Sequence, residues 1–149
     1  MKGTIERIRV YSTKGDMGRD LSEGRLIENQ GLEGDFYAKG GERQLSLLLM
    51  EIYDLFAAEK EQGSEIQGLC FSRFKENICI RGLAPDALRP GVRLETGETE
   101  LEISGEAKRC HDECKLHQAG KSCSLAGRNL FGKVLKSGVI RTGDEVHVR

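Results

Sequence analysis

The sequence predicts a mainly β protein, a closed or nearly closed β-barrel with a few helical insertions, in one domain that spans residues 1–149. Three observations support this prediction. Glycine is frequent, with 19 residues against only 2 prolines, and it separates short segments instead of forming a linker. Most of these segments alternate apolar and polar residues as strands do, and only one has helical spacing. A barrel is the economical way to join many short strands, because closure leaves no sheet edge unpaired.

The N-terminal half contains the first strands and the one convincing helix. In the helix, Ile52, Leu55 and Phe56 follow helical spacing against a charged face, and Gly63 is placed as the C-terminal stop. Alternation and turn residues bound the strands of this half and of the next. The predicted helix covers 51–62, and the predicted strands cover 3–11, 25–28, 44–49, 76–80, 92–95, 100–104, 130–135 and 145–148.

Two connections in the C-terminal half have hairpin composition. In 93–103, Gly97 supplies a turn between two alternating runs. In 134–148, Gly138 and Gly143 divide the chain into three short extended pieces. We therefore predict that the second half is antiparallel β.

Composition excludes several classes of function. The net charge is -1 with 32% charged residues, so no basic surface predicts binding to nucleic acid or to an anionic membrane. The N-terminus has no apolar signal region and no apolar run has membrane-spanning length, which predicts a cytoplasmic protein. In that reducing compartment, five cysteines indicate metal binding, catalysis or burial more than disulfides. Cys70 and Cys79 stand among apolar residues and are predicted to lie in the core.

The other three cysteines lie within fifteen residues of one another. Cys110 follows Lys108 and Arg109, whose charges favour a thiolate, so Cys110 is the candidate reactive or ligating residue. An ordinary half-buried cysteine is the alternative. The second interpretation of the cluster is a metal site, since thiolates and imidazoles suit zinc, although the spacing is not that of the usual paired knuckles. The candidate metal ligands are Cys110, His111, Cys114 and Cys123.

The order of several short motifs makes the chain resemble a MOSC domain, the module at the C-terminus of molybdenum-cofactor sulfurases, in its small free-standing bacterial form. The motifs are Gly-Leu-Glu-Gly-Asp at 31–35, Arg-Gln-Leu-Ser-Leu-Leu at 43–48, Phe-Lys-Glu-Asn-Ile at 74–78, 88–94, the Cys110 cluster and 138–144. The resemblance implies a β-barrel fold, binding of the molybdenum cofactor (molybdopterin), and a cysteine that ligates molybdenum or carries sulfur to it. That cysteine corresponds to Cys110.

The matched motifs also suggest cofactor contacts. Arg43 stands at the entry of an apolar strand, where its guanidinium fork could bind the phosphate of a pterin; the alternative is an ion pair with Glu33 or Asp35. Asn77 could present its amide to the pterin ring, or it could be a structural hydrogen-bonding residue. The predicted cofactor-binding residues are Arg43, Arg73, Asn77, Arg109 and Cys110.

Three functions follow from these patterns. In the first, the protein binds the molybdenum cofactor and carries or transfers sulfur through Cys110, with a cysteine desulfurase or a molybdoenzyme as its partner. In the second, the domain is a molybdenum-dependent reductase of N-hydroxylated compounds, with the metal bound by Cys110. In the third, the cysteines and a histidine bind structural zinc and the domain acts by protein interaction.

Overall fold

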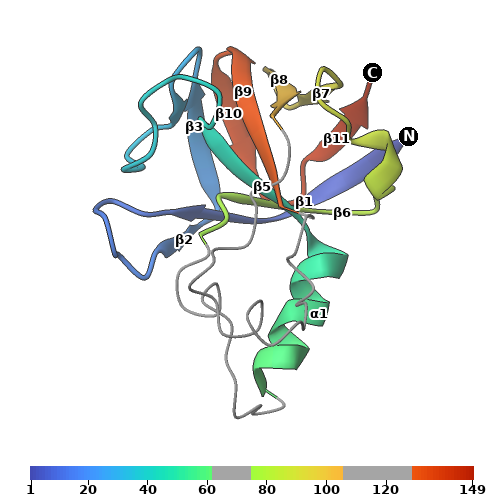
Figure 1. Ribbon diagram of the computed structural model, residues 1–149. Coiled ribbons are helices and arrows are strands. Elements are labelled where there is room, and N and C mark those ends of the chain that lie inside the picture. Colours follow the sequence, from blue (N-terminus) through green and yellow to red (C-terminus); the bar gives the residue numbers. More distant parts are fainter. Residues whose placement is uncertain (62–74, 106–128) are drawn as a thin grey trace.

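The computed structural model describes residues 1–61, 75–105 and 129–149, and it is mainly β, as predicted (Figure 1). The described part contains one α-helix, α1 (Met50–Glu61), and one 3-10 turn, η1 (Pro85–Ala87). Its strands are β1 (Lys2–Val10), β2 (Arg19–Leu21), β3 (Glu23–Ile27), β4 (Gly31–Leu32), β5 (Leu45–Leu49), β6 (Ile78–Arg81), β7 (Arg93–Thr96), β8 (Thr99–Ser104), β9 (Leu130–Lys136), β10 (Gly138–Arg141) and β11 (Glu145–Val148).

Seven strands close into a barrel in the order β11, β7, β8, β9, β5, β6 and β1, and the closing pair is β1 with β11. Strand β2 pairs antiparallel with the C-terminal part of β1 and adds one further strand to this sheet. The two chain ends meet beside the closing pair, where the amide of Val148 donates to the carbonyl of Met1 at 3.1 Å (Figure 1). The predicted closed β-barrel is therefore confirmed.

A second, three-stranded antiparallel sheet has the order β10, β3 and β4. It packs beside β8 and β9 of the barrel, and its apolar side chains Leu26, Leu32 and Ile140 are fully buried in the common core. Strand β9 of the barrel ends at Lys136, and β10 of the second sheet begins at Gly138. The chain therefore passes from the barrel into the second sheet within a single short connection. The two sheets thus share one core.

Parallel pairing of β5 with β6 requires a crossover connection, and α1 forms the described part of it. The helix begins directly after β5 and projects away from the barrel (Figure 1). Ile52 and Phe56 bury one face of α1, whereas Leu55 is 53% exposed. Arg81 of β6 links to Asp54 of the helix at 3.0 Å. The helix begins one residue before the predicted start at residue 51, and its predicted C-terminal stop, Gly63, lies outside the described residues.

The two predicted hairpins have different outcomes. The first is confirmed: β7 and β8 pair from Arg93 opposite Glu102 to Thr96 opposite Thr99, and Gly97 has a φ of 56° in the turn. The second is wrong as a hairpin, although its three extended pieces are strands. Strand β9 pairs with β8 and β5, β10 pairs with β3, and β11 pairs with β7 and β1. The physical reason is that the connection at Gly138 transfers the chain between sheets instead of turning it back.

Within the described residues, no helix combines the length and the hydrophobicity that crossing a membrane would need.

Cys79 is fully buried in β6 between β5 and β1, which confirms its prediction as a core residue. Burial, and secondly the charge of Glu76, raises the pKa of its thiol to about 12. Below the unfolded pKa of about 8.5, the thiol is neutral in both the folded and the unfolded state. Between that pH and about 12, only the unfolded state loses its proton, so the stabilisation that comes from the neutral buried thiol is lost as the pH rises.

We expect Cys79 to resist alkylation in the native protein at pH 8.5, because the reactive species is the thiolate. Mass spectrometry of the peptide containing Cys79, after treatment with iodoacetamide, measures this. The same peptide from denatured protein serves as the control and should be fully labelled. Equal labelling of both samples would contradict the buried position.

Candidate functional site

Four register-matched residues form a row across neighbouring strands, which we call the Phe131 row. Ser46 of β5 lies opposite Phe131 of β9, and Phe131 lies opposite Ser104 of β8. On the other side, the backbones of Ser46 and Asn77 are hydrogen-bonded at 2.8 Å, directly before β6. The inward-facing neighbours of the row, such as Leu47 and Ile103, are buried in the barrel core. The row therefore lies on the outer wall of the barrel.

Asn77 joins three segments at one end of this row. Its Oδ1 accepts from the amide of Ser46 at 3.0 Å, and its Nδ2 donates to the carbonyl of Arg9 and to Oδ1 of Asp35, both at 3.1 Å. The residue is only 4% exposed. These contacts are those of a structural hydrogen-bonding residue, and both amide hydrogens are already donated. A direct contact with a cofactor remains a prediction.

Asp35 holds the loop that leads from β4 to β5. Its carboxylate is buried and accepts from the amides of Tyr11 at 2.9 Å and Tyr37 at 3.1 Å, in addition to Asn77. Backbone donors thus satisfy this carboxylate without a cation. The Gly-Asp pair at the end of the 31–35 motif shapes the chain, because its carboxylate binds neighbouring backbone.

Arg43 lies exposed at the end of the same loop, with its guanidinium carbon 4.8 Å from the centre of the Phe131 ring. The predicted alternative, an ion pair with Glu33 or Asp35, is not found: Glu33 lies 3.9 Å from Arg25, and Asp35 binds backbone amides. Within residues 1–61, 75–105 and 129–149, no carboxylate pairs with Arg43. Among the residues that the structure describes, no carboxylate therefore competes with an anion for the guanidinium fork.

The residue before Arg43 is held by two outward-facing groups of the barrel. The hydroxyl of Ser104 donates to the carbonyl of Glu42, and Nζ of Lys133 lies 2.8 Å from the Glu42 carboxylate. The hydrogen bond that the Lys133 ammonium donates to the Glu42 carboxylate raises the pKa of this ammonium. Consequently the acidic neighbour of Arg43 already has a cationic partner.

Lys75 lies on the other side of Asn77 in the fold. Its ammonium lies 4.8 Å from the centre of the Tyr11 ring and donates to the carbonyl of Asp16, which ties the β1–β2 connection to the start of β6. Next to it, Glu76 is buried and lies 3.7 Å from Arg7 of β1. The stretch 75–77 thus fastens β6 to β1 and β5.

All of the other predicted site residues lie outside the described part of the chain. The structure describes Arg43 and Asn77, which Ser46 and the Phe131 row link, and it describes no group of three or more metal-ligating side chains among its residues. In the sequence, the segment containing Cys110 connects Gly105, next to Ser104, with Asn129, two residues before Phe131. The undescribed site residues are Arg73, Arg109, Cys110, His111, Cys114 and Cys123.

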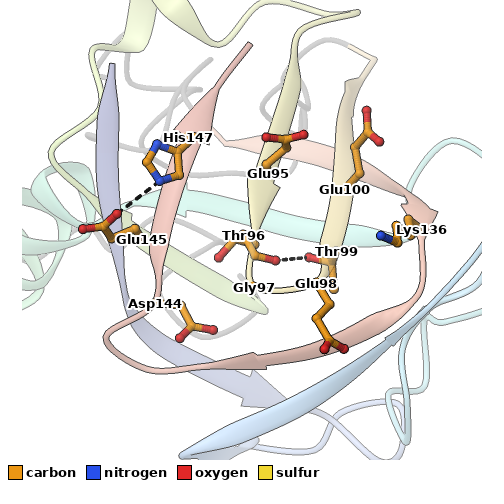
Figure 2. A pocket seen from close by; sticks show the side chains of 10 residues that line it. All are labelled: Glu95, Thr96, Gly97, Glu98, Thr99, Glu100, Lys136, Asp144, Glu145 and His147. Carbon is orange, nitrogen blue, oxygen red and sulfur yellow. Dashed lines mark hydrogen bonds and ion pairs between the residues drawn. The ribbon is translucent and has the colours of Figure 1, made fainter.

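A hollow of about 470 Å³ lies at the opposite end of the β8–β9 ladder from the Phe131 row (Figure 2). Five carboxylates line it, and three of them are paired, with Arg149, Arg93 and Lys2. Neither Arg43 nor Asn77 belongs to its lining. An acidic lining disfavours a phosphate-bearing ligand, so this hollow does not serve the anion-binding function that Arg43 indicates. The acidic lining residues are Glu95, Glu98, Glu100, Asp144 and Glu145.

Sequence reasoning missed Phe131 and Lys133. Their two-residue spacing in an alternating strand predicts that both face the same side. Nothing local shows that this side faces Glu42 and Arg43, because that contact depends on the pairing of β5 with β9, whose residues stand about 85 positions apart. Only the register of the closed barrel brings them together.

Fold and site together define a small β-barrel whose outer wall carries the Arg43 guanidinium, which pairs with no carboxylate of the described residues. The sequence profile of the MOSC domain matches residues 17–147, and the chain belongs to this family. The family is linked to binding of the molybdenum cofactor and to sulfur transfer.

Solved structures of low sequence identity have the same fold. The YuaD protein from Bacillus subtilis is 18% identical with a TM-score of 0.68, and the match covers 99% of this chain and 96% of that one. YiiM from Escherichia coli is 23% identical with a TM-score of 0.62, covering 100% and 70%. YiiM from Geobacillus stearothermophilus is 18% identical with a TM-score of 0.65, covering 99% and 75%. No curated protein matches the chain in sequence.

Proposed function

We propose that this protein binds the molybdenum–pterin cofactor on the outer wall of the barrel beside the Phe131 row, and that Cys110 ligates the metal or carries sulfur for a molybdoenzyme. The observation that carries the proposal is Arg43, an exposed guanidinium with an aromatic ring beneath it and no carboxylate partner in the described chain. Membership of the MOSC family supports the class of ligand.

The residues present fit such a ligand in two respects. A guanidinium fork binds phosphate oxygens in a bidentate manner, and cation–π contact with Phe131 limits its motion before the ligand arrives. The neighbouring carboxylates are occupied, Glu42 by Lys133 and Asp35 by backbone amides. A phosphate that binds Arg43 therefore does not have to displace either of these two carboxylates.

Cys110 supplies the soft ligand in this proposal. A thiolate suits molybdenum and can also carry a transferable sulfur as a persulfide, which a cysteine desulfurase partner would load. When bound, the cofactor supplies the metal to which sulfur is delivered. The protein's own residues hold the ligand: Arg43 binds its phosphate, and the Asn77 contacts keep the starts of β5 and β6 in place beneath it.

Metal and pterin analysis of protein purified from a cofactor-proficient host tests this function. We expect molybdenum and pterin on the wild type and, where Cys110 ligates the metal, about a tenfold or greater loss of molybdenum in Cys110→Ala. Intact-mass analysis should show a persulfide, 32 Da above the thiol form, that is absent from the variant. Cys79→Ala is the matched control, since its thiol is fully buried in the barrel core.

Two results would contradict the proposal. One is a wild-type protein and a Cys110→Ala variant that are equally free of molybdenum and pterin. The other is stoichiometric zinc in place of molybdenum, which would favour the structural zinc site.

A further inference from the structure

The Glu42–Arg43 dipeptide places an acid next in sequence to a guanidinium that has no carboxylate partner in residues 1–61, 75–105 and 129–149. A carboxylate next to Arg43 in sequence can compete with a ligand, because an ion pair between the two side chains would occupy the fork that a phosphate needs. The structure shows Glu42 turned to another partner, Nζ of Lys133 at 2.8 Å. The Glu42 side chain is 68% exposed and that of Lys133 is 29% exposed, so the lysine is the better fixed of the two.

Three barrel residues hold this dipeptide on the same outer surface. Phe131 and Lys133 alternate with the buried Gly132 and Val134 in β9, and Ser104 lies opposite Phe131. Each binds a different part: Ser104 binds the Glu42 carbonyl, Lys133 its carboxylate, and Phe131 the face of the Arg43 guanidinium. This division of contacts separates the two opposite charges of the dipeptide.

We propose that Phe131 and Lys133 are positioning residues for anion binding by Arg43. Phe131 fixes the guanidinium plane, and Lys133 keeps the Glu42 carboxylate away from it, so that the fork remains open to the phosphate of a ligand. This inference rests on the proposed function for the identity of the ligand. Its physical content, a phosphate group bound by Arg43 under the control of Lys133, can be tested with inorganic pyrophosphate alone.

The test is a titration of the purified protein with pyrophosphate, followed through the NMR signal of the Arg43 Nε–H group. Lys133→Ala releases Glu42 toward Arg43 and should weaken binding about fivefold. Adding Glu42→Gln to this variant removes the competitor and should restore the affinity to within twofold of the wild type. Phe131→Leu keeps an apolar side chain but removes the aromatic face, and should weaken binding about threefold.

Two control variants separate positioning from general electrostatics. Lys136→Ala removes an exposed positive charge from the far end of the same strand without releasing Glu42, so its affinity should stay within twofold of the wild type. Arg43→Ala, titrated by calorimetry because this variant lacks the NMR signal, should show no pyrophosphate binding. Wild-type affinity in Lys133→Ala, no recovery in the double variant, or no pyrophosphate binding by the wild type would each overturn the inference.

The outcomes also distinguish this inference from the proposed function. Normal molybdenum content, together with the same pyrophosphate affinity in Lys133→Ala and the wild type, would refute only the positioning role. If the variants show the predicted series of pyrophosphate affinities but the protein never contains molybdenum or pterin, only the proposed identity of the cofactor is refuted.

Discussion

Replacing Asn77 by alanine should lower the free energy of unfolding by about 3–5 kcal/mol, one of the two largest effects we predict. The substitution leaves the amide of Ser46 and the carbonyl of Arg9 without their side-chain partner in a region that is almost fully buried, and it removes one of the two donors to Oδ1 of Asp35. Each buried polar group left unsatisfied costs about 1–3 kcal/mol, and partial access of water reduces the sum. Urea denaturation followed by circular dichroism measures the loss.

Asn77→Asp tests whether hydrogen bonding causes this effect. The variant keeps the shape of the side chain but places a second carboxylate against Asp35, which raises the pKa of one member of the pair because two like charges lie close together. The shared proton is bound more tightly in the folded state, so its stabilising contribution is present at low pH and is lost as the pH rises. We therefore expect Asn77→Asp to recover part of the wild-type stability near pH 4, because a protonated carboxyl donates one of the two hydrogen bonds of the amide, and to resemble Asn77→Ala at pH 8. Equal destabilisation of both variants at all pH values would contradict this account.

Much of the barrel could be predicted because its strands carry local signals. Alternation in β1, β7, β8 and β11 and the glycine turn at Gly97 depend on neighbours in sequence, and the structure has them where expected. Strands β2 and β4 have three and two residues, too few for a periodic pattern. Parallel pairing of β5 with β6 and the crossover at Gly138 depend on the closed barrel, which no local stretch encodes.

The candidate site was predictable as a set of motifs but not as an arrangement. Closeness in sequence suggested Glu33 and Asp35 as partners of Arg43, yet the Asp35 carboxylate turns toward backbone amides that need an acceptor. The contact that Arg43 does make is with Phe131, which is 88 positions later in the chain. Strand register decides such contacts, and a shift of one residue would turn the Phe131 ring to the other face.

Replacing Gly31 by alanine should cost about 3–5 kcal/mol, comparable with the loss of Asn77. Gly31 has a φ of 138°, a conformation that residues with a side chain rarely adopt. A Cβ at this position would lie 2.5 Å from the carbonyl oxygen of Gln44 and 3.2 Å from Cα of Ala38. Both are backbone atoms, so the clash cannot be relieved by rotating a side chain.

Gly41→Ala is the matched control for backbone strain, because Gly41 has a φ of 79° in the same loop but no atom within 4 Å of an added Cβ. Strain alone should cost it about 1–2 kcal/mol. The difference between the two variants, measured by urea denaturation, therefore reports the close approach of Gly31 to Gln44. Because Gln44 directly follows Arg43, a displaced Gln44 carbonyl in Gly31→Ala should also weaken pyrophosphate binding. The pyrophosphate affinity of Gly41→Ala should be closer to that of the wild type. Equal losses of stability in the two variants would contradict this account. They would show that the cost of Gly31→Ala comes from backbone strain and not from the close approach of Gly31 to Gln44.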